Sequence, residues 1–163
     1  MPVLDEMEKQ KLFTFVMPRH EQGATFMAQG LSRASLSTDH PQIGVCMSTS
    51  GTGAMNLVTG VADAHMDSIP IVDITGQVAT GVIATEAFQE SDVFGVMMPV
   101  CKQTYMPLSA DEIEKTIHEA FYVATTGRSG PVVIDIPKDV QMQSTKENDT
   151  FDLKKFRPAL PGF

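Results

Sequence analysis

The sequence is poor in cysteine, in aromatic residues and in positive charge. Its 163 residues include two cysteines, two tyrosines and no tryptophan, and 12 lysines and arginines stand against 20 aspartates and glutamates. The resulting net charge of −8 argues against a surface that binds nucleic acid or an anionic membrane. No apolar run approaches the roughly 18 residues that a membrane-spanning helix needs, and no signal peptide is recognisable. Cys46 and Cys101 lie in apolar segments without metal-ligand spacing, so we expect two buried thiols of a cytosolic protein.

Apolar segments with strand composition alternate with segments of helical period along most of the chain. Strand is predicted where β-branched and apolar residues run together, and helix where apolar residues recur every three or four positions. Such alternation is typical of an α/β fold with three layers, in which helices cover both sides of a mainly parallel sheet. The predicted strands are residues 12–17, 43–49, 69–75, 100–106 and 131–136, and the predicted helices are residues 2–10, 22–34, 54–66, 91–97 and 109–126.

Two of the predicted helices carry further signals. Ser109 is the expected N-cap of the last helix, and Glu112 stands at the capping-box position three residues later. In the helix after residue 22 we expect an apolar face that packs on the sheet. That face consists of Ala24, Met27, Ala28 and Leu31.

One domain is expected for residues 1–141, with residues 142–163 as a linker or tail. The length suits a single domain that can bury a core. After Gln141 the sequence becomes polar and then rich in proline, as in segments outside a packed core. Residues 76–89 are expected to form a long loop of small residues, and such loops often carry function.

Glu21 is a candidate functional residue because it lies between a predicted strand and a predicted helix. Open α/β sheets bind ligands outside the carboxyl ends of their strands. Apolar neighbours at Ala24, Phe26 and Met27 would withdraw the carboxyl from water, which raises its pKa and prepares it to share a proton with a ligand. The alternative is a solvated glutamate in the first turn of a helix, where the helix dipole favours negative charge.

A glycine-rich turn, Ser50-Gly51-Thr52-Gly53, follows the second predicted strand. Its free N–H groups could hold a phosphate at the start of the next helix. It lacks the lysine of a Walker loop and the third glycine of a dinucleotide-binding fingerprint, so a tight strand-to-helix turn is the alternative. His20, His65 and Asp67 have no spacing that would close a metal site, and no metal site is expected in this domain.

Six blocks of sequence, in order along the chain, resemble one known family. The blocks are Arg19–Ala24, Ser50–Asn56, Ala62–Pro70, Thr75–Val78, Thr85–Glu90 and Gly130–Val140. They are similar to the amino-terminal, pyrimidine-binding domain of thiamine-diphosphate enzymes, and most closely to that of the acetolactate synthase (acetohydroxyacid synthase) catalytic subunits. The resemblance implies the thiamine-diphosphate-binding fold with its first strand apparently missing, because the family's domain begins earlier, with a helix, a strand and a Gly-Gly-Ala loop.

The resemblance implies a catalytic role for Glu21 and cofactor contacts for its neighbours. Glu21 matches the glutamate that hydrogen-bonds a ring nitrogen of the aminopyrimidine and shares a proton with it. Thr52 stands where family members usually have proline, in the turn that borders the ring. Asn56 matches a position near the cofactor, with a first-turn residue that bonds the backbone as the alternative.

Three further residues match the family's substrate channel. Phe88 and Gln89 match a Phe-Gln pair on the loop that closes over cofactor and substrate, and a core aromatic followed by a helix cap is the alternative. Ala79 stands where many members carry proline, at the mouth of the channel where herbicides bind. The change implies a less rigid loop.

The resemblance also implies cofactors, substrates and partners. Thiamine diphosphate would bind by its pyrimidine end, whereas Mg²⁺ and FAD would be held by domains outside this chain. The parent enzyme would condense two 2-keto acids such as pyruvate, with decarboxylation, in branched-chain amino acid biosynthesis, in the bacterial cytosol or, alternatively, a plastid. The fragment alone is expected to be inactive and to form a homodimer or higher oligomer through its unpaired sheet edge, with a regulatory small subunit as a further partner. The alternatives are a domain of another thiamine-diphosphate 2-keto-acid decarboxylase or oxidase, and a non-catalytic remnant.

Overall fold

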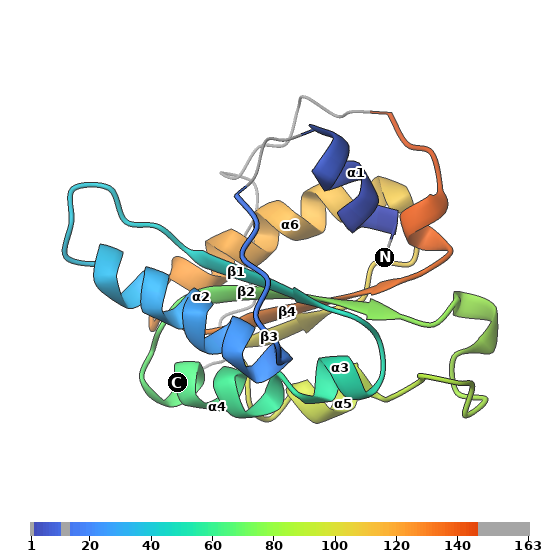
Figure 1. Ribbon diagram of the computed structural model, residues 1–163, viewed down its shortest axis with the longest axis horizontal. Helices are drawn as coiled ribbons and strands as arrows, with labels where there is room; N and C mark the ends of the chain where they lie inside the picture. The colour runs from blue at the N-terminus through green and yellow to red at the C-terminus, as the bar shows by residue number, and fades with distance from the viewer. Residues whose placement is uncertain (1, 11–13, 147–163) are drawn as a thin grey trace.

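The chain folds around a four-stranded, wholly parallel sheet in the strand order β1-β2-β4-β3. The computed structural model describes residues 2–10 and 14–146, and Figure 1 shows the arrangement of the elements. The helices are α1 (Pro2–Gln10), α2 (Glu21–Ser35), α3 (Thr52–Met55), α4 (Val58–Met66), α5 (Val93–Met97) and α6 (Ala110–Thr125), with short 3₁₀ turns η1 (Thr80–Val82) and η2 (Val140–Met142). The strands are β1 (Gly44–Ser48), β2 (Ile71–Gln77), β3 (Gln103–Tyr105) and β4 (Val132–Pro137).

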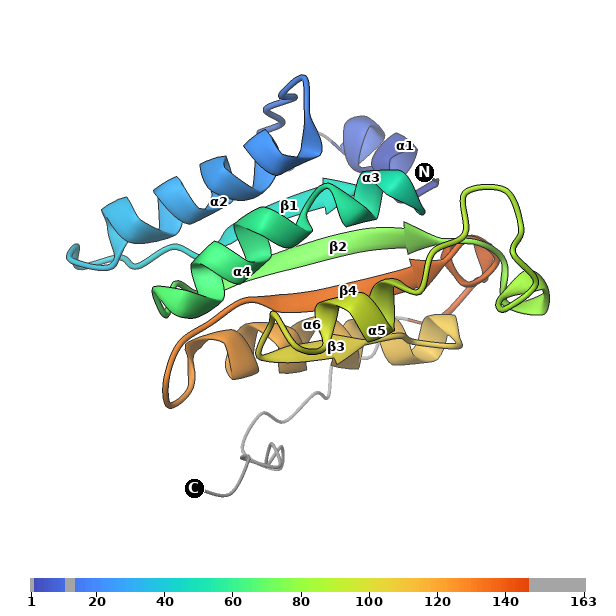
Figure 2. The same cartoon turned by 90° about the horizontal axis from the view of Figure 1, so that it is seen from below.

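Helices cover both faces of the sheet, so the expected three-layer α/β class is confirmed. The figures show α4 and α5 on one side of the sheet and α6 on the other, with α2 beside β1 (Figures 1 and 2). β2 and β4, the two central strands, are buried along almost their whole length. Neither side of these two strands therefore faces solvent, as expected for parallel strands covered by helices on both sides.

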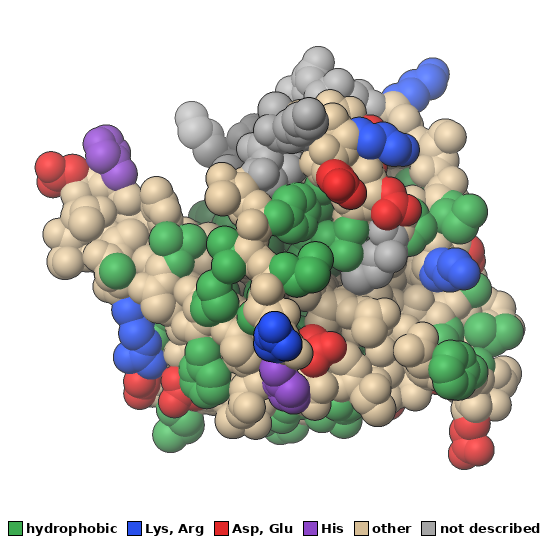
Figure 3. All heavy atoms as spheres, in the orientation of Figure 1, with side chains coloured by type: hydrophobic (Ala, Val, Ile, Leu, Met, Phe, Trp, Pro, Cys, Tyr) green, Lys and Arg blue, Asp and Glu red, His purple; other side chains and the backbone are tan. Residues whose placement is uncertain are grey.

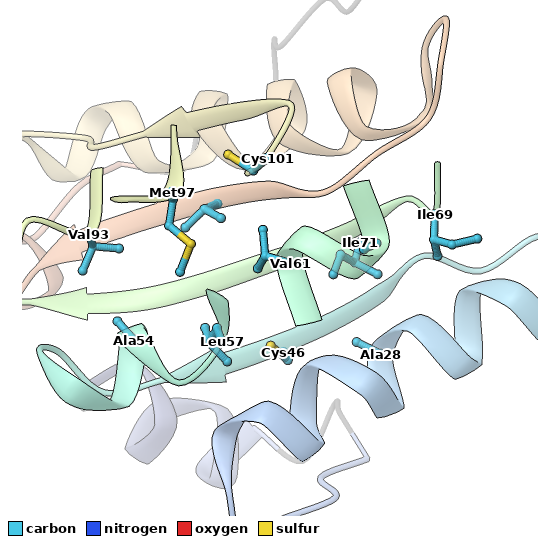
Figure 4. Close-up of a cluster of buried hydrophobic side chains, with 12 residues drawn as sticks. Ala28, Cys46, Ala54, Leu57, Val61, Ile69, Ile71, Val93, Met97 and Cys101 are labelled. Atoms are coloured by element: carbon cyan, nitrogen blue, oxygen red, sulfur yellow. The ribbon is translucent and has the colours of Figure 1, made fainter. Parts of the chain in front are cut away.

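Each face of the sheet has its own apolar cluster. The first cluster joins α2, α4 and α5 to one face, and its side chains meet there in Figure 4. The second joins α6 to the opposite face, with Val72, Val132, Ile134 and Ile136 as its buried strand residues. Both thiols are free and buried, Cys46 in β1 and Cys101 before β3, as the sequence predicts.

The strand predicted for residues 12–17 is wrong for the part that the structure describes. Residues 14–17 lie outside any strand, and Phe15, Val16 and Met17 are 48%, 64% and 91% exposed. Leu12 and Phe13 lie outside the described residues. Strand propensity expresses packing on neighbouring strands, and this segment has none beside it in the described sheet. β1 is accordingly the edge of that sheet.

The helix predicted for residues 54–66 is divided into α3 and α4. Leu57 N–H donates to Ala54 O, three residues back, so the α-helical bonding pattern is interrupted at the junction. The regular pattern resumes where Val61 N–H donates to Leu57 O at 2.9 Å. This break lets the first turn of the segment follow the glycine turn while α4 packs along the sheet.

The buried face of helix α2 overlaps the predicted one only in part. Ala28 is buried and Ala24 packs against the first cluster, but Met27 and Leu31 are 48% and 47% exposed. Small and polar side chains face inward because α2 lies close to its neighbours: Ser32 Oγ donates to Pro70 O at 2.7 Å and accepts from Gly44 N. The inward-facing residues are Thr25, Ala28, Gln29, Ser32 and Ser35.

The start of α6 also differs in detail from the prediction. Ser109 is the N-cap but makes no side-chain capping bond. Glu112 Oε2 instead accepts from Leu108 N at 2.9 Å, so the expected capping box is not formed. β3 is shorter than predicted, because residues 100–102 run as a turn before the strand. Of the predicted tail, Met142 is the last residue of η2, residues 143–146 follow it, and residues 147–163 lie outside the described residues. Within the described part of the chain, no helix is long and apolar enough to span a membrane.

Candidate functional site

Glu21 is the first residue of α2. The N-cap is His20, whose Nδ1 accepts from Gln22 N at 3.1 Å. Because residues 14–17 are not a strand, Glu21 does not follow the carboxyl end of one, and that part of the sequence argument is wrong. Its position comes instead from α2, which packs along β1 and α4 and places its first turn near the glycine turn.

The Glu21 carboxylate is held by Asn56. Asn56 Nδ2 donates to Glu21 Oε2 at 3.0 Å. This hydrogen bond, together with the backbone N–H of Glu21 itself, holds the pKa of the carboxyl below its ordinary value. The expected rise of the pKa by burial is therefore wrong, since Phe26 and Met27 are half-exposed and do not enclose the carboxyl. The alternative of a partly solvated, ionised first-turn glutamate describes this state.

The glycine turn, residues 50–53, lies between Glu21 and a second segment of the chain. A Cβ placed on Gly53 would lie 3.4 Å from Glu21 Oε1 and 2.6 Å from Cγ2 of Thr49. Gly51 has a φ of +66°, and a Cβ there would lie 2.7 Å from the carbonyl oxygen of Gln89. Glycine is required at both positions by close approach, and at Gly51 also by the left-handed backbone. Thr52, the first residue of α3, is exposed.

The second segment is the site loop, residues 78–92, whose tip we define as residues 84–90. Three non-glycine residues of the tip have a positive φ, namely Ala84 (68°), Glu86 (59°) and Gln89 (62°). Phe88 is 91% exposed, so it does not occupy a core position, and Gln89 contacts the glycine turn through its backbone. The core-aromatic alternative for Phe88 is thus ruled out.

Two carboxylates hold the conformation of the site loop by accepting hydrogen bonds from it. Glu90 accepts from the backbone N–H groups of Ala84 and, at 2.9 Å, Ala87. Asp139, after β4, accepts from Thr80 N at 2.9 Å and from Thr80 Oγ1 at 2.5 Å. These bonds hold the pKa of both carboxyls below the ordinary value. Ala79, the N-cap of η1, lies next to the Asp139 attachment at the base of the loop.

A row of polar side chains beneath α4 and α5 anchors the loop to the sheet. Gln77 Nε2 donates to Ser91 O and to Asp135 Oδ2, both at 2.9 Å, and Thr75 Oγ1 donates to Asp135 Oδ1 at 2.7 Å. Deeper in the sheet, Cys46 Sγ donates to Asp73 Oδ1 at 2.5 Å. Burial raises the pKa of Asp135 to about 6 and that of Asp73 to about 7.

The structure thus brings some of the predicted site residues together and not others. Glu21 and Asn56 are in contact, and the glycine turn links them to Gln89. No described contact joins Phe88 or Ala79 to Glu21, and no group of three or more His, Cys, Asp or Glu that could hold a metal occurs in residues 2–10 and 14–146. Sequence reasoning did not single out Gly51, Gln77 or Glu90, although each lies in one of the six blocks that carry the family resemblance. The contacts of Gly51 and Gln77 join segments far apart in the chain, and those of Glu90 depend on the backbone conformation of the loop.

Comparison with known proteins assigns this arrangement to a family. Residues 1–96 match the model of the thiamine pyrophosphate enzyme N-terminal TPP binding domain. An acetolactate synthase of Mycobacterium bovis is 49% identical over 140 residues, which cover 86% of this chain and 22% of that protein. The acetolactate synthase isozyme 1 large subunit of Escherichia coli is 44% identical over 163 residues (100% and 28%), and the large subunit of Cyanidium caldarium is 42% identical over 161 residues (97% and 27%). The chain spans between 22% and 28% of the length of these relatives. The chain belongs to the thiamine pyrophosphate enzymes, in the family of their N-terminal TPP binding domain.

Proposed function

We propose that the chain is the pyrimidine-binding part of an acetolactate synthase and that Glu21 is its catalytic residue. The observation that carries the proposal is the Glu21 carboxylate beside the glycine turn, with Oε2 held by Asn56 and Oε1 facing the space that Gly53 leaves open. A carboxylate fixed through one oxygen can offer the other to a ligand without losing its orientation.

The residues present fit the aminopyrimidine end of thiamine diphosphate. A neutral ring nitrogen needs a partner that can hold a proton toward it, and a carboxyl group can do so whereas an amide cannot exchange the proton. When bound, the cofactor supplies the nucleophilic carbon that attacks a 2-keto acid. Glu21 would hold a proton at the ring nitrogen and Asn56 would keep the carboxyl oriented. A ligand that covers Oε1 would raise the Glu21 pKa by withdrawing the carboxyl from solvent.

For the whole enzyme we propose the condensation of two 2-keto acids, such as pyruvate, with loss of carbon dioxide. The names of the relatives, acetolactate synthases, support this reaction. Mg²⁺ and FAD are proposed to bind in other domains of the parent enzyme. The term "large subunit" in the names of relatives supports a regulatory small subunit as a partner, and the bacterial cytosol, with a plastid as the alternative, is the proposed location.

The test is thiamine-diphosphate binding by calorimetry, with this chain alone and mixed with the carboxyl-terminal part of a related synthase. We expect binding and acetolactate formation in the mixture, and loss of both in Glu21→Gln. The matched control is Glu8→Gln, which removes an exposed carboxylate from α1. Equal activity of Glu21→Gln and Glu8→Gln would refute the role of Glu21, and a folded chain that binds in neither setting would favour a non-catalytic remnant.

We further propose that the chain self-associates through α2 and the β1 edge. β1 has a strand neighbour on one side in the described sheet, and Phe26, Met27 and Leu31 lie half-exposed on α2 beside it. Apolar side chains gather on this side of the molecule in Figure 3. Phe15, Val16 and Met17, which precede α2 in the chain, are exposed as well. An apolar face beside an open edge is a surface that a second copy can bury.

Light scattering tests this association. Leu31→Glu is expected to shift the chain toward the monomer, because it places a charge in the buried interface. Leu108→Glu, at a residue that is 61% exposed before α6, is the control and should leave the mass unchanged. A wild-type chain that is monomeric at every concentration tested would overturn the proposal.

A further inference from the structure

The tip of the site loop has an unusual backbone for a segment without glycine. Ala84, Glu86 and Gln89 all lie in the left-handed region within six positions. This region is strained for residues other than glycine, so the conformation persists only where other contacts impose it. The residues that make these contacts are therefore candidates for a functional role.

The first of these contacts is the Glu90 carboxylate. Its two oxygens accept from Ala84 N and Ala87 N, which closes the tip around one side chain. Glu90 N–H also donates to Ala87 O at 2.9 Å. Charge-assisted bonds to backbone N–H groups are stronger than neutral ones, and they are available only while Glu90 is ionised.

The second contact joins the closed tip to the glycine turn. The α-carbon of Gly51 faces the backbone of Gln89, and a Cβ would lie 2.7, 2.9 and 3.0 Å from its O, C and Cα atoms. The neighbouring atoms are backbone, which cannot move aside as a side chain can. Across the same turn, Gly53 approaches the Glu21 carboxylate. The turn thus has Glu21 on one side and Gln89 on the other.

We propose that Gly51 and Glu90 are positioning residues, which together dock the tip of the site loop on the glycine turn and hold Gln89 there before any ligand binds. The importance of this docking for the cofactor rests on the proposed function, whereas the docking itself does not. Because the strain of the tip is already balanced by these contacts, a ligand bound at Glu21 meets a preformed wall instead of ordering one, which saves the entropy of closing the loop.

Two matched pairs of variants test the proposal by amide NMR of the whole chain. Gly51→Ala and Gly127→Ala both place a Cβ on a residue of positive φ, +66° and +64°, but Gly127 has no atom within 4 Å of that position. Both variants share the strain of the left-handed backbone, so their difference isolates the contact. We expect only Gly51→Ala to shift the amide signals of Gln89 and Glu90.

The second pair is Glu90→Gln and Glu86→Gln, which remove one charge each from the same tip. In the wild type and in Glu86→Gln, the Ala84 and Ala87 amides should titrate together, with a midpoint below the ordinary glutamate pKa of 4.5. In Glu90→Gln this titration should vanish, and the two amides should exchange with solvent about tenfold faster or more. This variant keeps Gly51, so it decides the proposal even if Gly51→Ala fails to fold.

Calorimetry with thiamine diphosphate connects the docking to the cofactor. Gly51→Ala and Glu90→Gln should weaken binding about tenfold, and their controls should not. Equal NMR effects of Gly51→Ala and Gly127→Ala, or unchanged Ala84 and Ala87 amides in Glu90→Gln, would overturn the docking proposal. Failure of the wild-type mixture to bind would instead contradict the proposed function and leave the NMR result to decide the docking.

Discussion

The two faces of the sheet differ in the chemistry that they bury. Toward α6, β2 and β4 present Val72, Val132, Ile134 and Ile136, an apolar surface. Toward α4 and α5 the same strands present Asp73, Thr75, Gln77 and Asp135 among the apolar residues of the first cluster. The face toward α6 stabilises the fold by burying apolar side chains. The face toward α4 and α5, which we call the polar face, also buries polar side chains, and this contributes less stability but provides hydrogen bonds that reach the site loop.

The polar side chains of β2 follow one another toward the end of the strand that leads into the site loop. Asp73 lies in the middle of β2, and Thr75 and Gln77 follow it toward the carboxyl end, where Gln77 bonds the carbonyl of Ser91. On the α6 side no such path reaches a loop among the described hydrogen bonds. We infer that the side of the sheet toward α6 contributes most to stability, whereas the side toward α4 and α5 positions the site loop. Three measurements test this division.

The largest expected effect is on the α6 face. Ile134→Ala removes a side chain that is 1% exposed and should lower the free energy of unfolding by about 2–5 kcal/mol, the range for large-to-small core substitutions. Urea denaturation followed by circular dichroism measures it, with Leu108→Ala as the exposed control. The site loop should keep its amide signals in conditions where the variant is folded. A loss below about 1 kcal/mol would mean that the α6 face does not dominate stability.

A smaller effect is expected at the end of the polar face. Gln77→Ala leaves Ser91 O, Asp135 Oδ2 and Val78 N without their partner, which should cost about 1–3 kcal/mol. Unlike Ile134→Ala, it should also speed the amide exchange of residues 84–90. Gln42→Ala, at an exposed position with no described side-chain bond, serves as the control. If amide exchange in the loop is unchanged, the hydrogen bonds of the polar face do not hold the site loop in place.

The smallest effect is a dependence on pH. The folded-state pKa of Asp73, about 7, lies above the ordinary 3.8, so the folded chain keeps a proton that the unfolded chain releases between these values. The associated stability is fully present below pH 3.8 and is lost as the pH rises through about 7. Between pH 8 and pH 6 the wild type should therefore gain about 1 kcal/mol more stability than Asp73→Asn. Parallel pH profiles would show that Asp73 is ionised in the folded chain. Asp39→Asn, in an exposed loop, should follow the wild type.

The fold was largely predictable because its signals are local. The alternation of strands and helices predicted the α/β class, and buried runs such as residues 132–137 need no partner to be recognised. The strand at residues 12–17 failed because strand formation depends on a neighbouring strand, which a local pattern does not contain. The buried face of helix α2 was predicted wrongly in part for a similar reason. Its close approach to Gly44 and Gly60 favours small and polar residues on the buried side, and this approach is not visible in a local pattern.

The site was predictable only in part. Glu21 and Asn56 are found in contact, yet their 35-residue separation leaves no periodic signal, and the family resemblance pointed to both. The direction of the Glu21 pKa could not be predicted, because it depends on an amide donor from another element. The left-handed residues of the site loop were equally hidden, since none of them is a glycine.

The strand order has a consequence for synthesis of the chain. Among the described strands, β4 is the last to be made, but it lies between β2 and β3 and is the only one that pairs with β3. Until residues 132–137 have left the ribosome, β2 has an open side, and the apolar surface of Val72 has no cover from its neighbour. Nascent chains that end before β4 are thus expected to depend on chaperones, whereas those that extend beyond it can close the sheet in one step.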